Sequence, residues 1–203
     1  DRPSCILWDV EGLFYCILYM LKLFLSICDR EVMLMTKANV SLGGKDILDI
    51  ASLSVDEIEL VLKTAAEMKK IMKRDIKKVP SLRGKAIVTL FYENSTRTRT
   101  SFELAGKYLG ADVVNITTSS SSVAKGECLR DTILTLQSMN FDAIVMRHPM
   151  EGAAAYAAKI SPAVVINAGD GAHAHPSQAL LDLFTIREDG KKDFTRISDY
   201  SRD

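Results

Sequence analysis

The chain has 203 residues, of which 47% are hydrophobic and 26% are charged, a balance typical of a soluble globular protein. This length suits one ordinary domain with its own hydrophobic core, or at most two small ones. Basic and acidic residues number 26 each, so the chain has no overall positive charge that would favour nucleic acid as a partner. Any site for an anion must therefore be local.

The cysteines are Cys5, Cys16, Cys28 and Cys128. Three of them lie in one apolar N-terminal stretch, and none forms a close pair of the metal-ligand type. We interpret them as free thiols in a reducing compartment, which predicts a cytoplasmic protein.

An apolar run near the N-terminus differs from the rest of the chain. Residues 12–28 read GLFYCILYMLKLFLSIC, and only Lys22 interrupts them. The run is at the lower limit of length for a span of the bilayer. It follows Asp9 and Glu11 rather than a basic segment, which argues against a signal peptide.

Three interpretations of this run are open. It is a membrane anchor, an additional helix packed on a partner, or sequence upstream of the natural start. We favour the last, because Met33 and Met35 stand just before ordinary soluble sequence. Residues 1–35 are therefore expected not to belong to the native domain, and no membrane partner is expected.

Regular patterns begin at Ser54, which forms a capping-box pattern with Glu57 at the start of an amphipathic helix to about residue 74. Strand and helix patterns then alternate. The predicted strands are 86–92, 112–116, 142–146 and 163–167, and the further helices are 96–109, 127–139, 151–159 and 176–188. In helix 127–139, one face is expected to be formed by Leu129, Ile133, Leu136 and Met139.

This alternation, without hairpin signals, predicts an α/β fold: a parallel four-stranded sheet flanked by helices. In open sheets of this kind, ligands bind beyond the carboxyl ends of the strands. Polar clusters follow every predicted strand, at residues 93–97, 117–125, 147–149 and 168–178. The sequence therefore predicts one binding edge.

The first cluster contains S-T-R-T-R at residues 95–99, where a helix begins. Free backbone N–H groups, the hydroxyls of Ser95, Thr96 and Thr98, and the guanidinium of Arg97 together suit a phosphate. The alternative is an ordinary Ser95 N-cap with Arg97 and Arg99 in solvent. Two arginines in a first turn oppose the helix dipole unless an anion is bound, which favours the phosphate site.

The second and third clusters are less specific. The serine-rich loop 117–125 is either a disordered connector or a carrier of Lys125 to a phosphate. Arg147 and His148 are expected just after a buried strand, where an arginine is either surface or directed at the phosphate.

The fourth cluster, NAGDGAHAHPSQ, contains Gly169 and Gly171 for turns. His175 is either a plain N-cap or a ligand-binding group, and Gln178 either a solvated first-turn residue or part of the site. His173 and His175 alone, without a third ligand, are weak support for a metal, and no metal is expected.

Four segments carry a resemblance to a known family. FYENSTRTRTSFELAGKYLGADVVN, SSSSVAKGECLRDT, AIVMRHPMEGAA and VINAGDGAHAHPSQALLDLFTI resemble successive motifs of the aspartate/ornithine carbamoyltransferase family, over roughly residues 44–188. Features of the second and fourth segments favour the aspartate type of catalytic chain. The resemblance implies the family's carbamoyl-phosphate-binding domain at residues 36–188.

The resemblance also implies roles for individual residues. Ser95, Thr96, Arg97 and Thr98 would hold the phosphate of carbamoyl phosphate. Thr98, Arg147 and His175 would polarise the carbamoyl oxygen, and Gln178 would hold the carbamoyl amino group. The remaining site residues are Ser121 and Lys125, which would reach a neighbouring subunit's site in a homotrimer, and Glu93, which would act in domain closure.

The implied reaction is carbamoyl transfer to L-aspartate in pyrimidine biosynthesis, without a cofactor. After about Glu188, residues 189–203 do not match the amino-acid-binding domain that the family pattern would continue with. We therefore expect a fragmentary version of a longer enzyme, inactive alone. Ornithine carbamoyltransferase and a non-catalytic phosphate-binding or oligomerising fragment remain as alternatives.

Overall fold

The computed structural model describes residues 42, 44–117 and 127–188. Their elements alternate along the chain and build a four-stranded parallel sheet in the order β2-β1-β3-β4. In chain order the elements are α3 (Val55–Met72), β1 (Ala86–Phe91), α4 (Thr96–Tyr108), β2 (Asp112–Thr117), α5 (Leu129–Ser138), β3 (Ala143–His148), α6 (Ala153–Ile160), β4 (Val164–Asp170) and α7 (Pro176–Glu188).

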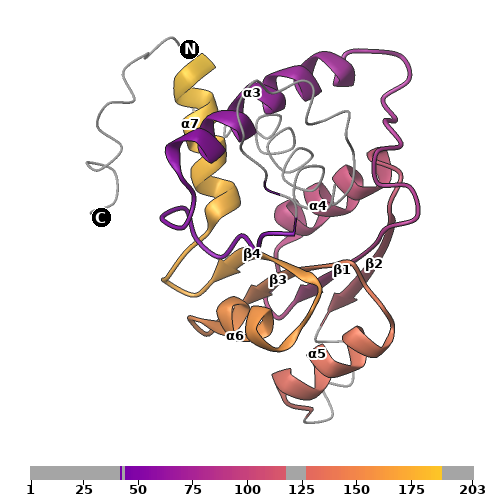
Figure 1. The fold of residues 1–203 in the computed structure, drawn as a ribbon, viewed down its shortest axis with the longest axis vertical. Coiled ribbons are helices and arrows are strands. Elements are labelled where there is room, and N and C mark those ends of the chain that lie inside the picture. Colours follow the sequence, from indigo (N-terminus) through magenta and orange to yellow (C-terminus); the bar gives the residue numbers. More distant parts are fainter. Residues whose placement is uncertain (1–41, 43, 118–126, 189–203) are drawn as a thin grey trace, which may run out of the picture.

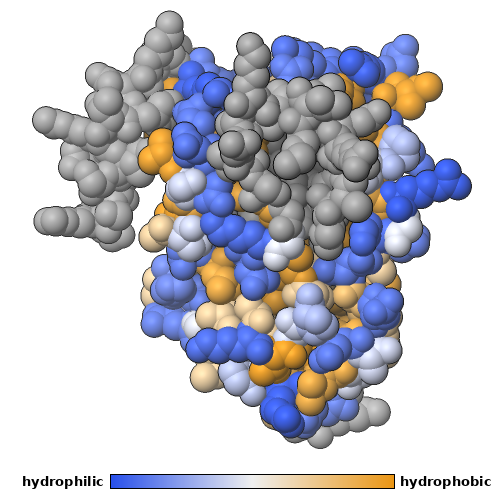
Figure 2. Space-filling view, in the orientation of Figure 1, coloured by the Kyte–Doolittle hydropathy of each residue, from blue (hydrophilic) through white to orange (hydrophobic). Residues whose placement is uncertain are grey.

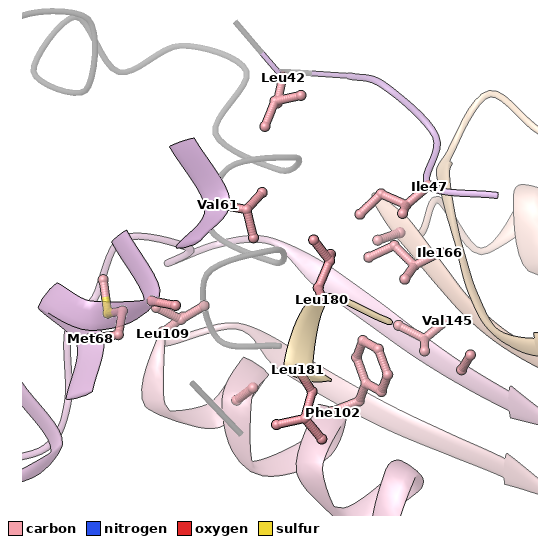
Figure 3. Packing of buried hydrophobic residues seen from close by; sticks show 14 of the residues in the cluster. Leu42, Ile47, Val61, Met68, Phe102, Leu109, Val145, Ile166, Leu180 and Leu181 are labelled. Carbon is pink, nitrogen blue, oxygen red and sulfur yellow. The ribbon is translucent and has the colours of Figure 1, made fainter. Parts of the chain in front are cut away.

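Helices cover both faces of the sheet (Figure 1). α3, α4 and α7 lie on one side, and α5 and α6 lie on the other. Each side has its own cluster of buried hydrophobic residues. On the first side, Phe102 of α4 lies close to Leu180 and Leu181 of α7, beside Val145 of β3 (Figure 3). The central strands β1 and β3 are thus buried on both faces, as their continuous apolar sequence predicts.

The outer edge of β4 is covered by the segment that precedes α3. Ile47 bridges Ile166 in parallel: its N–H donates to the Val165 carbonyl at 2.9 Å, and its carbonyl accepts from Asn167 N–H at 2.8 Å. α3 then begins at Ser54, whose hydroxyl accepts from Glu57 N–H while the Glu57 carboxylate accepts from Ser54 N–H at 2.7 Å. The predicted capping box is confirmed.

The predicted fold class and the alternation of elements are confirmed, with three corrections. β3 continues through Arg147 and His148, because their backbone still pairs with neighbouring strands. For the same reason β4 continues to Asp170. Met139 is 62% exposed rather than buried with Ile133, because it is the C-cap after the last helical residue of α5.

Among the described residues, no helix combines the length and the apolar character needed to cross a membrane. On the face seen in Figure 2, hydrophobic and hydrophilic residues of the described chain are interspersed. Cys128 is a free, exposed thiol, as predicted. The apolar run at 12–28 and the other three cysteines lie outside the described residues.

Candidate functional site

The carboxyl ends of the four strands lie at one edge of the sheet because all strand pairs are parallel. We call this end of the sheet the carboxyl edge. The segments that leave it carry Glu93, the start of α4, and the 171–175 loop that leads into α7. The predicted convergence of the strand exits is therefore present in the fold, and the following contacts define its chemistry.

Arg147 lies within β3 at this edge, opposite Phe91 of β1. Its Nε donates to Glu93 Oε2 at 3.1 Å, and its Nη1 donates to the Ala168 carbonyl at 3.2 Å. The guanidinium is therefore held between the exits of β1 and β4. Because Glu93 precedes the α4 N-cap Ser95 by two residues, this ion pair also places Arg147 beside the start of α4.

An irregularity between β3 and β4 shapes the same place. Met146 pairs with Asn167, but His148 pairs with Asp170, so β4 contains one additional residue there. Gly169 lies in this bulge with a φ of +116°, a conformation that a side chain rarely adopts. A Cβ at Gly169 would lie 2.9 Å from Arg147 Nη1 and 3.3 Å from His175 Cδ2. The side chains of Arg147 and His175 therefore both pack against Gly169, in the space that a Cβ atom would otherwise occupy.

His175 precedes Pro176, the first residue of α7, and caps this helix with its ring. Its Nδ1 accepts from Gln178 N–H at 3.3 Å and lies 3.0 Å from Ser177 Oγ, whose hydroxyl is able to donate to it. The N-cap role foreseen for His175 is thus present, but it does not exclude the second role. With Nδ1 as the acceptor, the proton of the neutral ring is on Nε2, which is left as a donor.

The electrostatic surroundings keep this ring neutral. Burial of His175, together with the positive charge of Arg147, lowers the pKa of its imidazole to about 4. At neutral pH the ring is therefore uncharged, and it offers an N–H to an oxygen without adding a second cation beside Arg147.

The N-terminus of α4 has the properties expected of an anion site. Its N-cap, Ser95, makes no side-chain capping hydrogen bond, and no acidic residue lies in the first turn. Thr96 and Arg97 are exposed, whereas Thr98 is buried. Within this first turn, the backbone N–H groups and the positive end of the helix dipole are thus accompanied by hydroxyl and guanidinium side chains and by no carboxylate.

Two further predicted residues have roles in local structure. Gln178 Nε2 donates to Asp182 one turn along α7, at 3.2 Å, so its side chain has a partner other than His175. His173 Nδ1 lies 3.1 Å from both carboxylate oxygens of Asp170. The described residues contain no group of three or more metal-ligand side chains, and His173 and His175 have separate partners.

Ser121 and Lys125 lie outside the described residues, so their predicted contribution stays a prediction. Sequence reasoning did not identify Asn167 or Asp170, and it assigned Gly169 only to a turn. The N-A-G-D-G pattern at 167–171 was the available signal, since polar residues flanking a glycine at a strand end indicate an unusual backbone.

The fold and this edge define an open α/β domain of the class that binds ligands beyond its strand ends. The chain belongs to the aspartate/ornithine carbamoyltransferase family: residues 45–188 match the model of its carbamoyl-P binding domain. The resemblance recognised in the sequence is therefore confirmed.

Individual relatives point to one branch of this family. The chain is 66% identical over 144 residues to the aspartate carbamoyltransferase catalytic subunit of Desulforamulus reducens, covering 71% of this chain and 46% of that protein. It is 62% identical over 149 residues to the subunit of Syntrophomonas wolfei, covering 73% and 48%. The chain thus spans about half the length of the curated relatives it matches.

Solved structures agree. Aspartate transcarbamoylase from Trypanosoma cruzi, in complex with carbamoyl phosphate and aspartate, matches with a TM-score of 0.67 and 39% identity, covering 71% of this chain and 47% of that one. The catalytic subunit of the M. Jannaschii enzyme matches with a TM-score of 0.66 and 45% identity, again covering 71% and 47%.

Proposed function

We propose that this chain binds carbamoyl phosphate at its carboxyl edge and serves in transfer of the carbamoyl group to L-aspartate. The observation that carries the proposal is the meeting of Arg147 and neutral His175 against Gly169, beside the start of α4. The T. cruzi relative has been solved with these two substrates. The products would be N-carbamoyl-L-aspartate and phosphate, an early step of pyrimidine biosynthesis.

The phosphate would be bound at the N-terminus of α4. Its donors would be the backbone N–H groups of the first turn, the hydroxyls of Ser95, Thr96 and Thr98, and the Arg97 guanidinium. Two observations support this role. The first turn contains no acidic side chain, so it supplies no counter-charge to the positive helix end, and the Ser95 side chain makes no capping hydrogen bond to the first-turn N–H groups.

The carbamoyl oxygen would be bound by Arg147, Thr98 and the Nε2–H of His175. These donors stabilise the negative charge that develops on that oxygen when an amine attacks. Gln178 would hold the carbamoyl amino group through its amide oxygen, since its amide nitrogen already donates to Asp182. Glu93, which pairs with Arg147 in this structure, would change partners when the enzyme closes on its substrates.

The proposed reaction needs neither a covalent enzyme intermediate nor a cofactor. The amino nitrogen of aspartate forms a bond to the carbamoyl carbon and loses a proton. The bond from this carbon to the phosphate oxygen breaks, and phosphate leaves with the bonding electrons. Orientation of the two substrates and electrostatic stabilisation of the oxyanion would supply the rate acceleration.

The proposal extends to domain organisation and partners. The match over residues 45–188 supports one carbamoyl-phosphate-binding domain at about 36–188, with residues 1–35 and 189–203 outside it. We propose a cytoplasmic homotrimer in which Ser121 and Lys125 complete a neighbour's site. The free thiol of Cys128 is compatible with a reducing compartment. Relatives of the aspartate type favour aspartate over ornithine as the acceptor.

Titration calorimetry of the chain with carbamoyl phosphate tests the binding step. The proposal expects saturable binding that competes with inorganic phosphate, because both ligands share the α4 site. For the acceptor, the second half of a relative's catalytic subunit is fused after Glu188, and transfer to aspartate and to ornithine is compared. Transfer only to ornithine would contradict the aspartate assignment, and absence of carbamoyl phosphate binding would contradict the whole proposal.

A further inference from the structure

Asp170, the last residue of β4, has a buried carboxylate to which the proposed reaction gives no role. The residue is 1% exposed. Its Oδ1 accepts from Asn167 Nδ2 at 2.8 Å and from Ala174 N–H at 3.1 Å, and its Oδ2 accepts from Gly152 N–H at 2.9 Å. His173 Nδ1 lies 3.1 Å from each oxygen.

These donors come from three segments: β4 itself, the start of α6 and the 171–175 loop. The last two adjoin the segments that carry Arg147 and His175. Gly152 is the N-cap of α6 and follows the strand that carries Arg147. Ala174 directly precedes His175. A further link joins the same two segments, since Gly171 N–H donates to the His148 carbonyl at 3.0 Å. The carboxylate therefore connects the exit of β3 with the loop that presents His175.

The surroundings of Asp170 favour a charged carboxylate. Burial by itself would raise the pKa of this carboxyl, but hydrogen bonds from Asn167, Gly152, His173 and Ala174 outweigh that effect and hold the pKa below its usual value. Two of the donors are backbone N–H groups, which an acceptor-only group satisfies. The N-terminus of α6 also favours a negative charge.

We propose that Asp170 is a positioning residue for carbamoyl transfer: its carboxylate fixes the 171–175 loop against the start of α6 and so sets His175 beside Arg147. This inference rests on the proposed function, because the position of His175 matters to the reaction only if its ring binds the carbamoyl group.

The test compares Asp170→Asn with Asp142→Asn in the full 203-residue chain. Asp142 is a matched control at the opposite end of the sheet: its carboxylate also accepts from a backbone N–H, that of Ala86 at 2.9 Å, and from a side-chain cation, Lys85 at 2.7 Å. In both variants an NH₂ group replaces an oxygen that faces N–H donors, so both should lower the free energy of unfolding.

Only Asp170→Asn should change the site. We expect displaced or broadened NMR signals of the His175 ring in the ligand-free protein, and about tenfold weaker binding of carbamoyl phosphate, the effect of one lost hydrogen bond. Binding of inorganic phosphate should change less than about twofold, because the α4 donors do not depend on the 171–175 loop. Asp142→Asn should alter neither the His175 signals nor either affinity.

A milder variant covers the case in which Asp170→Asn does not fold. His173 has a side chain 46% exposed, so His173→Ala removes one donor to the carboxylate with little loss of packing. It should displace the His175 signals in the same direction by a smaller amount. Unchanged His175 signals in the folded variants, or equal effects of Asp170→Asn and Asp142→Asn, would overturn the inference. If the wild type binds no phosphate ligand, the proposed function fails, whereas the His175 spectra still decide the positioning role.

Discussion

The two ends of the sheet use their charged residues differently. At the amino end, Asp142 accepts from Ala86 N–H and from Lys85, and Asp142 N–H donates to the Ala86 carbonyl. These groups satisfy one another and join β1 to β3. At the carboxyl edge, the N-cap of α4 makes no side-chain bond and its first turn lacks an acid. His175 there retains an Nε2–H beside Arg147.

The polar groups of the amino end serve the fold, whereas those of the carboxyl edge are the ones we propose bind a ligand. Lys85 and Asp142 pair with each other, and the Asp142 carboxylate also accepts a backbone hydrogen bond. Their charges are therefore already compensated, and a ligand would form few new interactions there. Arg147 has its own acid, Glu93, but it also lies beside the positive end of α4 and beside the neutral ring of His175, which adds an N–H donor and no charge. An arrangement that gathers positive potential at one edge favours an anion there.

The largest expected effect comes from removing the arginine at the carboxyl edge. Arg147→Ala should weaken carbamoyl phosphate binding by about 3 kcal/mol, roughly 150-fold, because charge-assisted contacts to the ligand are lost. Lys85→Ala is the matched loss of a cation at the amino end, where a partly exposed ion pair contributes about 0–1 kcal/mol to stability. Calorimetry should show an unchanged affinity of Lys85→Ala for carbamoyl phosphate. If both substitutions weakened binding equally, the two ends of the sheet would not differ in ligand binding as proposed.

A second pair of variants separates backbone strain from contact with the site. Gly169→Ala places a Cβ 2.9 Å from Arg147 Nη1, whereas Gly84→Ala, at a φ of +81°, meets nothing within 4 Å. Both should lose about 1–2 kcal/mol of stability, because neither conformation suits an L residue. Only Gly169→Ala displaces the guanidinium, and it should weaken carbamoyl phosphate binding by about 2 kcal/mol. Normal affinity of a folded Gly169→Ala would show that this contact does not position Arg147.

The third prediction concerns the start of α4. Arg97→Ala should weaken inorganic phosphate binding by about 1.5–2 kcal/mol, the value of a charge-assisted hydrogen bond. Arg83→Ala removes an exposed arginine from the loop before β1, at the amino end, and serves as the control. Competition between labelled and unlabelled phosphate measures both affinities. Indistinguishable values for Arg97→Ala and wild type would remove Arg97 from the site.

The smallest effect is on the pH dependence of stability. The folded-state pKa of His175, about 4, lies below the ordinary value of 6.5, so the unfolded chain binds more protons between these limits. Stability should therefore fall as the pH is lowered from about 6.5 to about 4, by about 1 kcal/mol from this ring after allowance for partial exposure. The free energy of unfolding, measured with urea at several pH values, should fall more steeply between about pH 6.5 and about 4 for the wild type than for His175→Gln. Equal pH dependence of the two proteins would contradict a buried neutral ring at His175.

The sequence predicted the parallel sheet and its binding edge because the buried strands are continuous apolar runs with polar residues directly behind them. It could not predict how far those strands extend. Arg147 and His148 are polar, yet they stay in β3 because β1 and β4 pair with them. That pairing depends on residues remote in sequence, so the local sequence pattern cannot predict where β3 ends.

The same limit applies to the candidate site. S-T-R-T-R predicted where α4 begins and suggested the proposed phosphate site there, because capping and dipole effects act within one turn. The Arg147–Glu93 pair joins residues 54 positions apart, and the role of Asp170 depends on donors from 3 to 18 positions away, including Gly152 N–H across the fold. Such contacts follow from the packed fold, which is why Asp170 and Gly169 became recognisable only in three dimensions.

We propose that the carboxyl edge binds the ligand and that the amino end does not. Backbone amide NMR spectra recorded during titration with carbamoyl phosphate test this claim residue by residue. The largest shift changes are expected at residues 95–99, at Arg147 and in the 168–178 segment, and the signals of Lys85, Ala86 and Asp142 should stay unchanged. Saturable changes centred on the amino end, or binding that leaves residues 95–99 and His175 undisturbed, would contradict it.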